Sequence, residues 1–286
     1  MARPAGSTSS SSHPEPGEGA RRLPPPRKSL GQHFLTDRNI IRKIADAAEL
    51  TPADTVVEIG AGPGDLTSEL AARARRVFAV EVDAQLCARL RERFASVPNV
   101  VVVHADALKL DMNSLTGGKP YVVVGNLPYN VGTAIVRHLL ESTAPPGRMV
   151  VMLQREVALS MLAPKAQTGL LAISVQVYAT GRRLFDIPPG AFYPPPKVVS
   201  SLLRLDRRPQ PLVPPGEREA FFRVVRAGFS SPRKQVRNAL ANGLQVPAAR
   251  VEAALRAAGI DPAARPSTIT IEQWLRLMRE LDARSA

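Results

Sequence analysis

A chain of 286 residues, 44% of them hydrophobic, is long enough for one large domain or two smaller ones and is too apolar to be disordered throughout. No apolar run approaches the roughly 18 residues that a membrane helix requires, and a single cysteine excludes an intramolecular disulfide. The net charge of +13 indicates a polyanionic partner, and nucleic acid is favoured over a membrane because no long basic amphipathic segment is present.

The N-terminal residues 1–27 are predicted to form a disordered basic tail, because they are rich in serine, proline and glycine and lack an apolar period. A helix is expected over Asp37–Leu50, where apolar residues recur at helical spacing. Beyond it, apolar strand-like runs alternate with helix-length segments, which predicts an α/β fold with a doubly wound, Rossmann-like sheet. The runs are Thr55–Ile59, Val77–Glu81, Val100–His104, Tyr121–Gly125, Met149–Leu153, Ile173–Tyr178 and Ser201–Leu205.

The first four runs are nearly continuous in valine and isoleucine, as expected of parallel strands buried on both faces. The last two runs are separated only by the loop Ala179–Ser200, which is broken by prolines and allows an antiparallel return. Residues 28–206 are therefore expected to form one α/β domain.

Residues 207–286 are predicted to form a small all-helical domain. The segment Arg207–Pro215 contains four prolines and is interpreted as a linker. The region carries fourteen basic and seven acidic residues, a net charge of +7 in 80 residues, so nucleic-acid contacts are expected there. Helices are expected over Glu217–Phe229, Arg233–Gly243, Ala248–Ala258 and Ile271–Leu281.

The first strand leads into a glycine-rich turn, residues 60–64, that opens a helix. Its spacing differs from the dinucleotide-binding pattern, so a pyrophosphate site is not expected. Glu81 ends the next strand, where an acid can bind ribose hydroxyls, and Asp106 follows the third, where a carboxylate can accept a hydrogen bond from an adenine amine. Two acids beside a glycine turn predict a nucleoside site.

The fourth strand is followed by Asn126-Leu127-Pro128-Tyr129. An amide, carbonyls held near a proline and an aromatic ring suit a site that grips the amino edge of a flat heterocycle and stacks on it. The alternative is an ordinary strand-to-helix turn in which the asparagine caps and the proline stiffens. The neighbouring glycine turn and acids favour the ligand site.

These motifs resemble those of class I S-adenosylmethionine methyltransferases that act on adenine amino groups, and in particular the KsgA-like 16S rRNA adenine dimethyltransferases. The resemblance extends over about residues 28–286 and includes the segments Leu30–Leu35, Phe192–Ser200 and Arg233–Asn238. It implies S-adenosylmethionine as cofactor, S-adenosylhomocysteine as product and no metal. It also implies that 16S rRNA in a 30S precursor is the partner of a cytoplasmic, monomeric enzyme.

The resemblance also assigns roles to residues. Asn126 and the Leu127 carbonyl would orient the amine, and Tyr129 would stack on a flipped base with Phe192 on its opposite face. No general base is expected, because the methyl donor is already activated and positioning is the main catalytic task. The cofactor-binding set is His33, Leu35, Gly60, Gly62, Glu81, Asp106 and Asn126, and the catalytic set is Asn126, Leu127, Pro128, Tyr129 and Phe192.

For RNA binding, the resemblance points to Arg233, Lys234 and Arg237. Ser231 is expected to cap this helix with Pro232 at its first position, which would put Arg233 and Arg237 on one face. The alternative is a solvated helix face without a ligand.

The expected function is dimethylation of two adjacent adenosines in the hairpin loop near the 3′ end of 16S rRNA during small-subunit biogenesis. One alternative is a 23S rRNA methyltransferase of the macrolide-resistance type, and another is a non-catalytic ribosome-assembly or transcription factor on the same fold. Leu127, the N-terminal motif and the basic C-terminal segment favour the first. The intact glycine turn and the segment 126–129 argue against a loss of activity.

Overall fold

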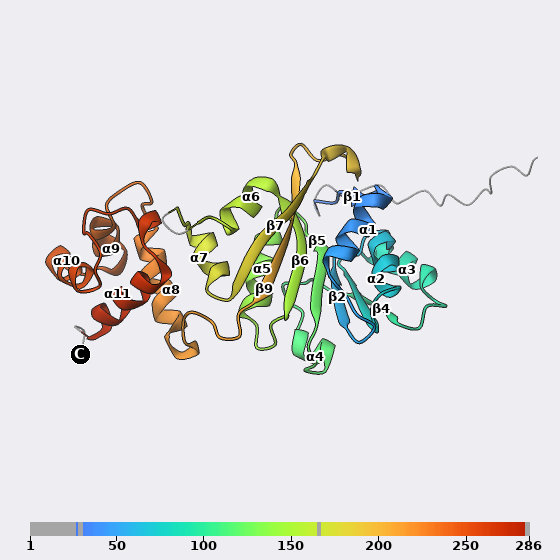
Figure 1. The fold of residues 1–286 in the computed structure, drawn as a ribbon, viewed down its shortest axis with the longest axis horizontal. Coiled ribbons are helices and arrows are strands. Elements are labelled where there is room, and N and C mark those ends of the chain that lie inside the picture. The colour runs from blue at the N-terminus through green and yellow to red at the C-terminus, as the bar shows by residue number, and fades with distance from the viewer. Residues whose placement is uncertain (1–26, 28–30, 165–166, 284–286) are drawn as a thin grey trace, which may run out of the picture.

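The computed structural model describes residues 27, 31–164 and 167–283, so the predicted tail lies outside the described residues except for Arg27. Seven strands form a sheet in the order β4-β3-β2-β5-β6-β9-β7 (Figure 1). They are β2 (Thr55–Ile59), β3 (Arg76–Glu81), β4 (Val100–His104), β5 (Val122–Asn126), β6 (Arg148–Gln154), β7 (Ala179–Ile187) and β9 (Ser200–Arg207).

The first five strands in this order, β4, β3, β2, β5 and β6, are parallel to one another. Strand β9 runs antiparallel to β6, and β7 runs antiparallel to β9. Every residue of the inner strand β2 is buried, including Thr55 and Glu58, as expected of a parallel strand that is covered on both faces. The structure therefore confirms the α/β class and six of the seven expected strands. The far edge of the sheet is antiparallel, but β9 pairs with β6 and β7 and not with the run Ile173–Tyr178.

Helices cover both faces of this sheet (Figure 1). Alternate side chains of β2 point into the two helical layers: Val56 packs in the hydrophobic cluster on one face of the sheet, and Val57 packs in the cluster on the other face. The first face is covered by α1 (Arg38–Ala47), α2 (Asp65–Ala71) and α3 (Ala84–Arg93). The second is covered by α4 (Met112–Thr116), α5 (Gly132–Glu141), α6 (Arg155–Met161) and α7 (Leu170–Gln176).

The strand expected over Ile173–Tyr178 is wrong, because most of this run belongs to the helix α7. Residues Ala172 to Val175 are all buried, so the helix has no polar face to reveal its period. A short apolar run of this kind cannot be assigned to strand or helix by periodicity. The remaining strand of the sheet, β7, lies instead in the segment Ala179–Ser200, which was predicted to be a loop.

Two short strands form a separate antiparallel ribbon over one end of the sheet. Strand β1 (Phe34–Leu35) pairs with β8 (Phe192–Tyr193), and the Thr36 backbone N–H donates to the Ala191 carbonyl at 2.9 Å. The ribbon ties the N-terminal motif to the proline-rich loop at the end of the domain where the parallel strands finish (Figure 1).

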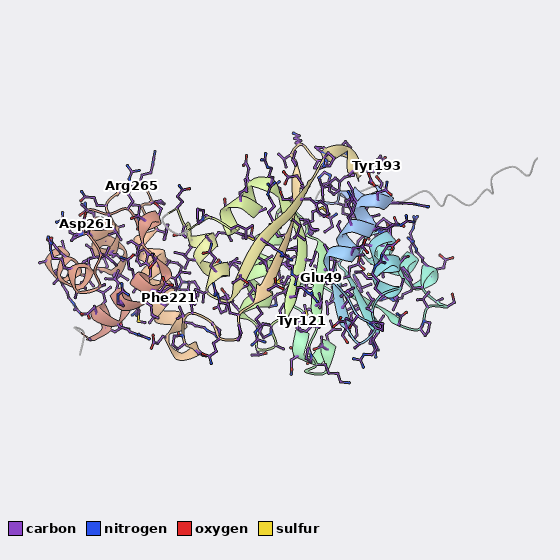
Figure 2. All side chains as sticks on the ribbon, in the orientation of Figure 1. Glu49, Tyr121, Tyr193, Phe221, Asp261 and Arg265 are labelled. Atoms are coloured by element: carbon purple, nitrogen blue, oxygen red, sulfur yellow. The ribbon has the colours of Figure 1, made fainter. Side chains whose placement is uncertain are left out.

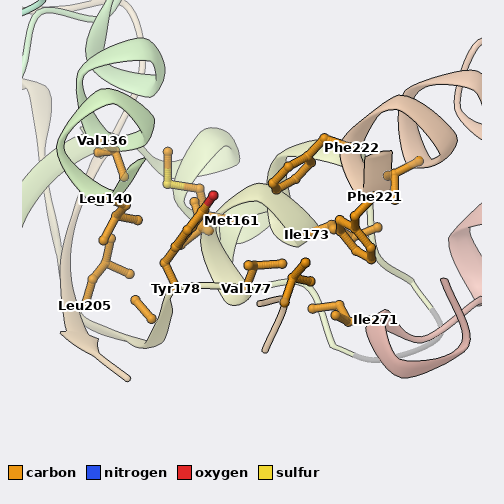
Figure 3. Close-up of a cluster of buried hydrophobic side chains, with 14 of the residues drawn as sticks. Val136, Leu140, Met161, Ile173, Val177, Tyr178, Leu205, Phe221, Phe222 and Ile271 are labelled. Carbon is orange, nitrogen blue, oxygen red and sulfur yellow. The ribbon is translucent and has the colours of Figure 1, made fainter. Parts of the chain in front are cut away.

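The C-terminal region is helical, as predicted, and packs on the α/β region through shared apolar side chains. Figure 3 shows Phe221 and Phe222 beside Ile173, Val177 and Tyr178. The ring centroids of Phe222 and Tyr178 are 6.4 Å apart. The division into two domains at residues 206 and 207 stays a prediction. The helices are α8 (Arg218–Gly228), α9 (Val236–Leu244), α10 (Ala248–Ala257) and α11 (Ile271–Ala283).

Within the ranges that the structure describes, no helix is long and apolar enough to cross a membrane.

Candidate functional site

A cavity at the carboxyl ends of the parallel strands collects most of the predicted site residues. This is the edge at which doubly wound sheets bind ligands. The structure brings nine of them together along its walls: His33, Gly60, Gly62, Glu81, Asp106, Asn126, Leu127, Pro128 and Tyr129.

The glycine turn lies directly against the segment that follows β5. Gly60 has a φ of +75°, and a Cβ atom placed on it would lie 2.9 Å from the Asn126 carbonyl oxygen. The turn is also tied to the neighbouring strand, because the Gly60 N–H donates to the Val80 carbonyl at 2.9 Å. A residue without a side chain is therefore required for conformation and for space.

The variant Gly60→Ala is expected to lower the free energy of unfolding by about 1–3 kcal/mol, because alanine is strained at this φ and meets a backbone atom. Chemical denaturation measures the loss. The matched control is Gly216→Ala, where φ is not positive and no atom lies within 4 Å of the added Cβ. Equal stability of the two variants would show that the turn relaxes at no cost.

Three backbone N–H groups hold the Glu81 carboxylate at the cavity wall. One oxygen accepts from Val82 at 2.9 Å and Asp83 at 3.0 Å, and the other accepts from Gly62 at 2.9 Å. These charge-assisted bonds fix the carboxylate where β3 ends and connect it to the glycine turn. Each oxygen has two lone pairs, so the second oxygen retains acceptor capacity for a hydroxyl group.

Asp106 lies at the neighbouring part of the cavity, in the turn after β4. Its carboxylate accepts the Leu108 backbone N–H at 3.0 Å, which holds the side chain in place. Val82 and Leu108 line the same region, and sequence reasoning missed both. The only signal for them is their position directly after Glu81 and two residues after Asp106. An acid between apolar walls suits a purine ring with an amine at its edge.

The side-chain amide of Asn126 has a defined orientation. Its nitrogen donates to the His33 carbonyl oxygen at 2.8 Å, and because a carbonyl only accepts, the atom pointing at it is Nδ2. The side-chain oxygen of Asn126 is therefore left as an acceptor in the cavity. The N-terminal motif thus orients the first residue of the segment 126–129 through its backbone.

The Tyr129 ring is held at its face and at its hydroxyl. The His33 ring stacks on it with centroids 5.4 Å apart, and the His33 Nδ1–H donates to the Pro194 carbonyl at 2.7 Å. The Tyr129 hydroxyl lies 2.5 Å from the hydroxyl of Ser200, which is fully buried. Burial raises the pKa of Tyr129, so the phenol is protonated at neutral pH.

Two predicted site residues do not line the cavity. The side chain of Phe192 is only 4% exposed, and that of its ribbon partner Leu35 is 8% exposed. Both side chains pack in the core cluster under α1. The stacking role predicted for Phe192 is not supported by this arrangement, because its ring is covered. Leu35 lies next to the cavity residue Phe34 in the chain but has its own side chain in the core.

The basic segment differs from its prediction. Helix α9 begins at Val236 with Gln235 as its N-cap, so Ser231 and Pro232 do not start it. The Val236 N–H donates to the Ala264 carbonyl at 2.8 Å, and this tertiary bond keeps the preceding residues in a turn.

Arg233 and Lys234 therefore lie in the exposed turn rather than on a helix face with Arg237. Within the described part of the chain, neither residue has an acidic partner. Arg237, by contrast, pairs with Glu252 at 3.1 Å. The turn is thus the more available half of the predicted RNA contact.

A family model described as ribosomal RNA adenine dimethylase matches residues 25–283. A protein from Dehalococcoides mccartyi, described as ribosomal RNA small subunit methyltransferase A, is 46% identical over 253 residues, 88% of this chain and 87% of that protein. A protein of the same description from Moorella thermoacetica is 45% identical over 267 residues, 90% of this chain and 92% of that protein.

Two solved structures have the same fold. The 23S rRNA methyltransferase ErmE is 34% identical with a TM-score of 0.69, covering 87% of this chain and 99% of ErmE. A dimethyladenosine transferase from Plasmodium falciparum is 24% identical with a TM-score of 0.77, covering 88% of this chain and 98% of that one. The family match covers the α/β region, the cavity and the C-terminal helices together, and this chain belongs to the ribosomal RNA adenine dimethylase family.

Proposed function

We propose that this protein dimethylates the exocyclic amines of two adjacent adenosines in the hairpin loop near the 3′ end of 16S rRNA, using S-adenosylmethionine. The observation that carries the proposal is the orientation of Asn126, whose amide oxygen is left as an acceptor in the cavity that Glu81 and Asp106 also line. The enzyme acts as a monomer on a 30S precursor particle in the cytoplasm.

The cavity fits the cofactor by the chemistry of its walls. Glu81 provides an anchored carboxylate for ribose hydroxyls, and Asp106 provides one for an adenine amine. The Gly60 and Gly62 backbone allows close approach of the ligand. When bound, S-adenosylmethionine supplies a methyl group activated by its sulfonium.

The target amine is a poor nucleophile, because its lone pair is delocalised into the adenine ring. Acceptors directed at its two N–H bonds orient it and favour the geometry of attack. The Asn126 side-chain oxygen and the Leu127 carbonyl are the two acceptors that the segment offers, and His33 keeps the first of them in place.

The flipped base stacks on the face of Tyr129 away from His33, a contact that contributes roughly 1–3 kcal/mol. The Tyr129 phenol is protonated at neutral pH because burial raises its pKa, so it does not serve as a general base. None is needed, since the amine is cationic after transfer and loses its proton to water. The second transfer begins from an amine with one N–H fewer, so one of the two acceptors then lacks a donor.

The choice of the small-subunit RNA rests on relatives. The two described as small-subunit methyltransferases are 46% and 45% identical to this chain, whereas the 23S enzyme ErmE is 34% identical. The test is transfer of labelled methyl groups to purified, unmethylated 30S and 50S particles, with the labelled nucleotides mapped. Label confined to two adjacent adenosines of 16S rRNA is expected, and label in 23S rRNA would support the macrolide-resistance alternative.

A non-catalytic assembly or transcription factor is the remaining alternative. Isothermal titration with S-adenosylmethionine separates it from an enzyme, because the anchored Glu81 carboxylate and the open glycine turn are expected to give measurable binding. The absence of binding both with and without 30S particles would favour the factor.

Arg233→Ala is expected to weaken RNA binding and to reduce the slope of log K against log salt by about one unit, because one phosphate contact is lost. Binding measured over a series of salt concentrations tests this. The control is Arg223→Ala, an exposed arginine of α8 that already pairs with Asp282 at 3.3 Å. A slope for Arg233→Ala equal to that of the wild type would remove this residue from the RNA surface.

A further inference from the structure

The β1–β8 ribbon has two faces, and they place neighbouring aromatic residues in different surroundings. Side chains of directly opposed residues in an antiparallel pair lie on the same face. Leu35 is paired with Phe192, and both are buried in the core. Phe34 is paired with Tyr193, and the Phe34 ring packs against Gly62 of the glycine turn. Tyr193 is thus on the cavity side of the ribbon.

Tyr193 is also close to the residues that hold the base-stacking face. It precedes Pro194, whose carbonyl accepts from His33, and the His33 ring stacks on Tyr129. Unlike these cavity residues, Tyr193 is 57% exposed. Figure 2 shows it at the end of the α/β region that carries the β1–β8 ribbon. Its ring is therefore available at the mouth of the proposed base site.

Apolar and basic side chains are exposed on the loop that carries Tyr193 and on the helix α6 that begins beside this loop. Four large apolar side chains are exposed among the described residues, and three of them, Leu159, Tyr193 and Val198, belong to the proline-rich loop or to α6. The Arg155 N–H donates to the Val199 carbonyl at 3.0 Å, so α6 begins beside the loop. Leu159 lies one helical turn after Arg155 and therefore on the same side of α6.

We define the mouth patch as Tyr193, Val198, Leu159 and the exposed basic residues Arg155 and Lys197. Arg155 pairs with Asp186 at 3.3 Å, so Lys197 is the cation of the patch on which the argument depends. An isolated exposed apolar residue is ordinary, but a group of them with cations at a cavity mouth indicates a binding surface. Extruding one base from an RNA loop leaves its neighbour unstacked, and an exposed aromatic ring beside cations suits such a nucleotide. Pro194, Pro195 and Pro196 restrict the loop, so little order is lost on binding.

We propose that the mouth patch binds the nucleotide next to the flipped adenosine, with Tyr193 stacking on its base and Lys197 contacting the backbone phosphate. This inference rests on the proposed function and extends it, because it assigns a second base-binding position to the same enzyme.

The test uses the full-length protein and 30S particles reconstituted with 16S rRNA that is either natural or carries one abasic residue beside the target adenosine. With natural particles, Tyr193→Ala is expected to raise Kd roughly 5- to 150-fold, the range for the loss of one stacked base. Tyr193→Phe keeps the ring and is expected to stay within about twofold of the wild type. With particles that are abasic at the stacked position, the Kd of the wild type is expected to rise by the same factor as Tyr193→Ala raises it on natural particles. The Kd of Tyr193→Ala is expected to be the same on abasic and natural particles.

Lys197→Ala is expected to reduce the salt slope of binding, whereas Lys119→Ala, an exposed lysine before β5 at the opposite end of the sheet, leaves it unchanged. An unchanged Kd for Tyr193→Ala overturns the inference. So does an equal loss on natural and abasic particles, which assigns the patch to the RNA backbone or to a ribosomal protein. These results leave wild-type methylation intact, whereas failure of the proposed function appears as absence of methylation by the wild type.

Discussion

Asn126→Ala is expected to lower the rate of methyl transfer at saturating cofactor and RNA by roughly 10²–10³-fold, the effect of removing one preorganised hydrogen-bonding group from a catalytic site. The variant loses the side-chain oxygen that is proposed to orient the amine, and the N–H donor that fixes the side chain to the His33 carbonyl. Single-turnover kinetics with 30S particles measures the chemical step.

The dissociation constant for the RNA is expected to stay near the wild-type value, because the proposed stacking on Tyr129 and the proposed contacts of the basic C-terminal turn remain. Asn113→Ala is the matched control, an exposed amide in α4 at the opposite end of the sheet. A loss of RNA affinity as large as the loss of rate would contradict the orienting role, because it would mean that Asn126 acts in binding alone.

The part of the site that follows the parallel strands could be predicted from the sequence. Glu81 and Asn126 occupy the last positions of β3 and β5, and Asp106 comes shortly after β4. Strands of continuous valine and isoleucine are identifiable because they are buried on both faces, and parallel strands bring their carboxyl ends to one edge. Residues separated by 20 or more positions therefore meet without any knowledge of side-chain contacts.

The features that were missed depend on tertiary contacts. Strands β1 and β8 are two residues long, so no alternating pattern identifies them. The ribbon they form buries Phe192, which was expected to stack on the base, and exposes Tyr193, for which no role was expected. The predicted start of α9 was wrong for a related reason, because the Val236 N–H donates a hydrogen bond to the distant Ala264 carbonyl.

A neutral acid beneath the glycine turn is a further feature that could not be predicted from the sequence. Glu58 lies in the middle of β2, is 1% exposed and accepts a hydrogen bond from the Thr67 hydroxyl at 2.5 Å. Burial raises the pKa of Glu58 to about 8, and the negative charge of Glu81 adds to this shift. The carboxyl group is therefore neutral at pH 7, which leaves Glu81 as the charged acid of the turn.

The raised pKa makes the stability of the protein depend on pH. Between the ordinary value of 4.5 and about 8, the folded state holds a proton on Glu58 that the unfolded state releases, so this stabilisation is present below pH 4.5 and is lost as pH rises to about 8. Glu58→Gln keeps the shape without the titration. Relative to the wild type, the variant is expected to gain roughly 3–6 kcal/mol between pH 4.5 and pH 9.

Chemical denaturation across this pH range measures the difference in free energy of unfolding, with the exposed Glu219→Gln of α8 as the control that leaves the pH profile unchanged. Parallel profiles for Glu58→Gln and the wild type would mean that Glu58 is already ionised at neutral pH. Two carboxylates, Glu58 and Glu81, would then be charged beneath and beside the glycine turn. In the proposed assignment only Glu81 is charged, because Glu58 is protonated and the Glu81 carboxylate is held by three backbone N–H groups.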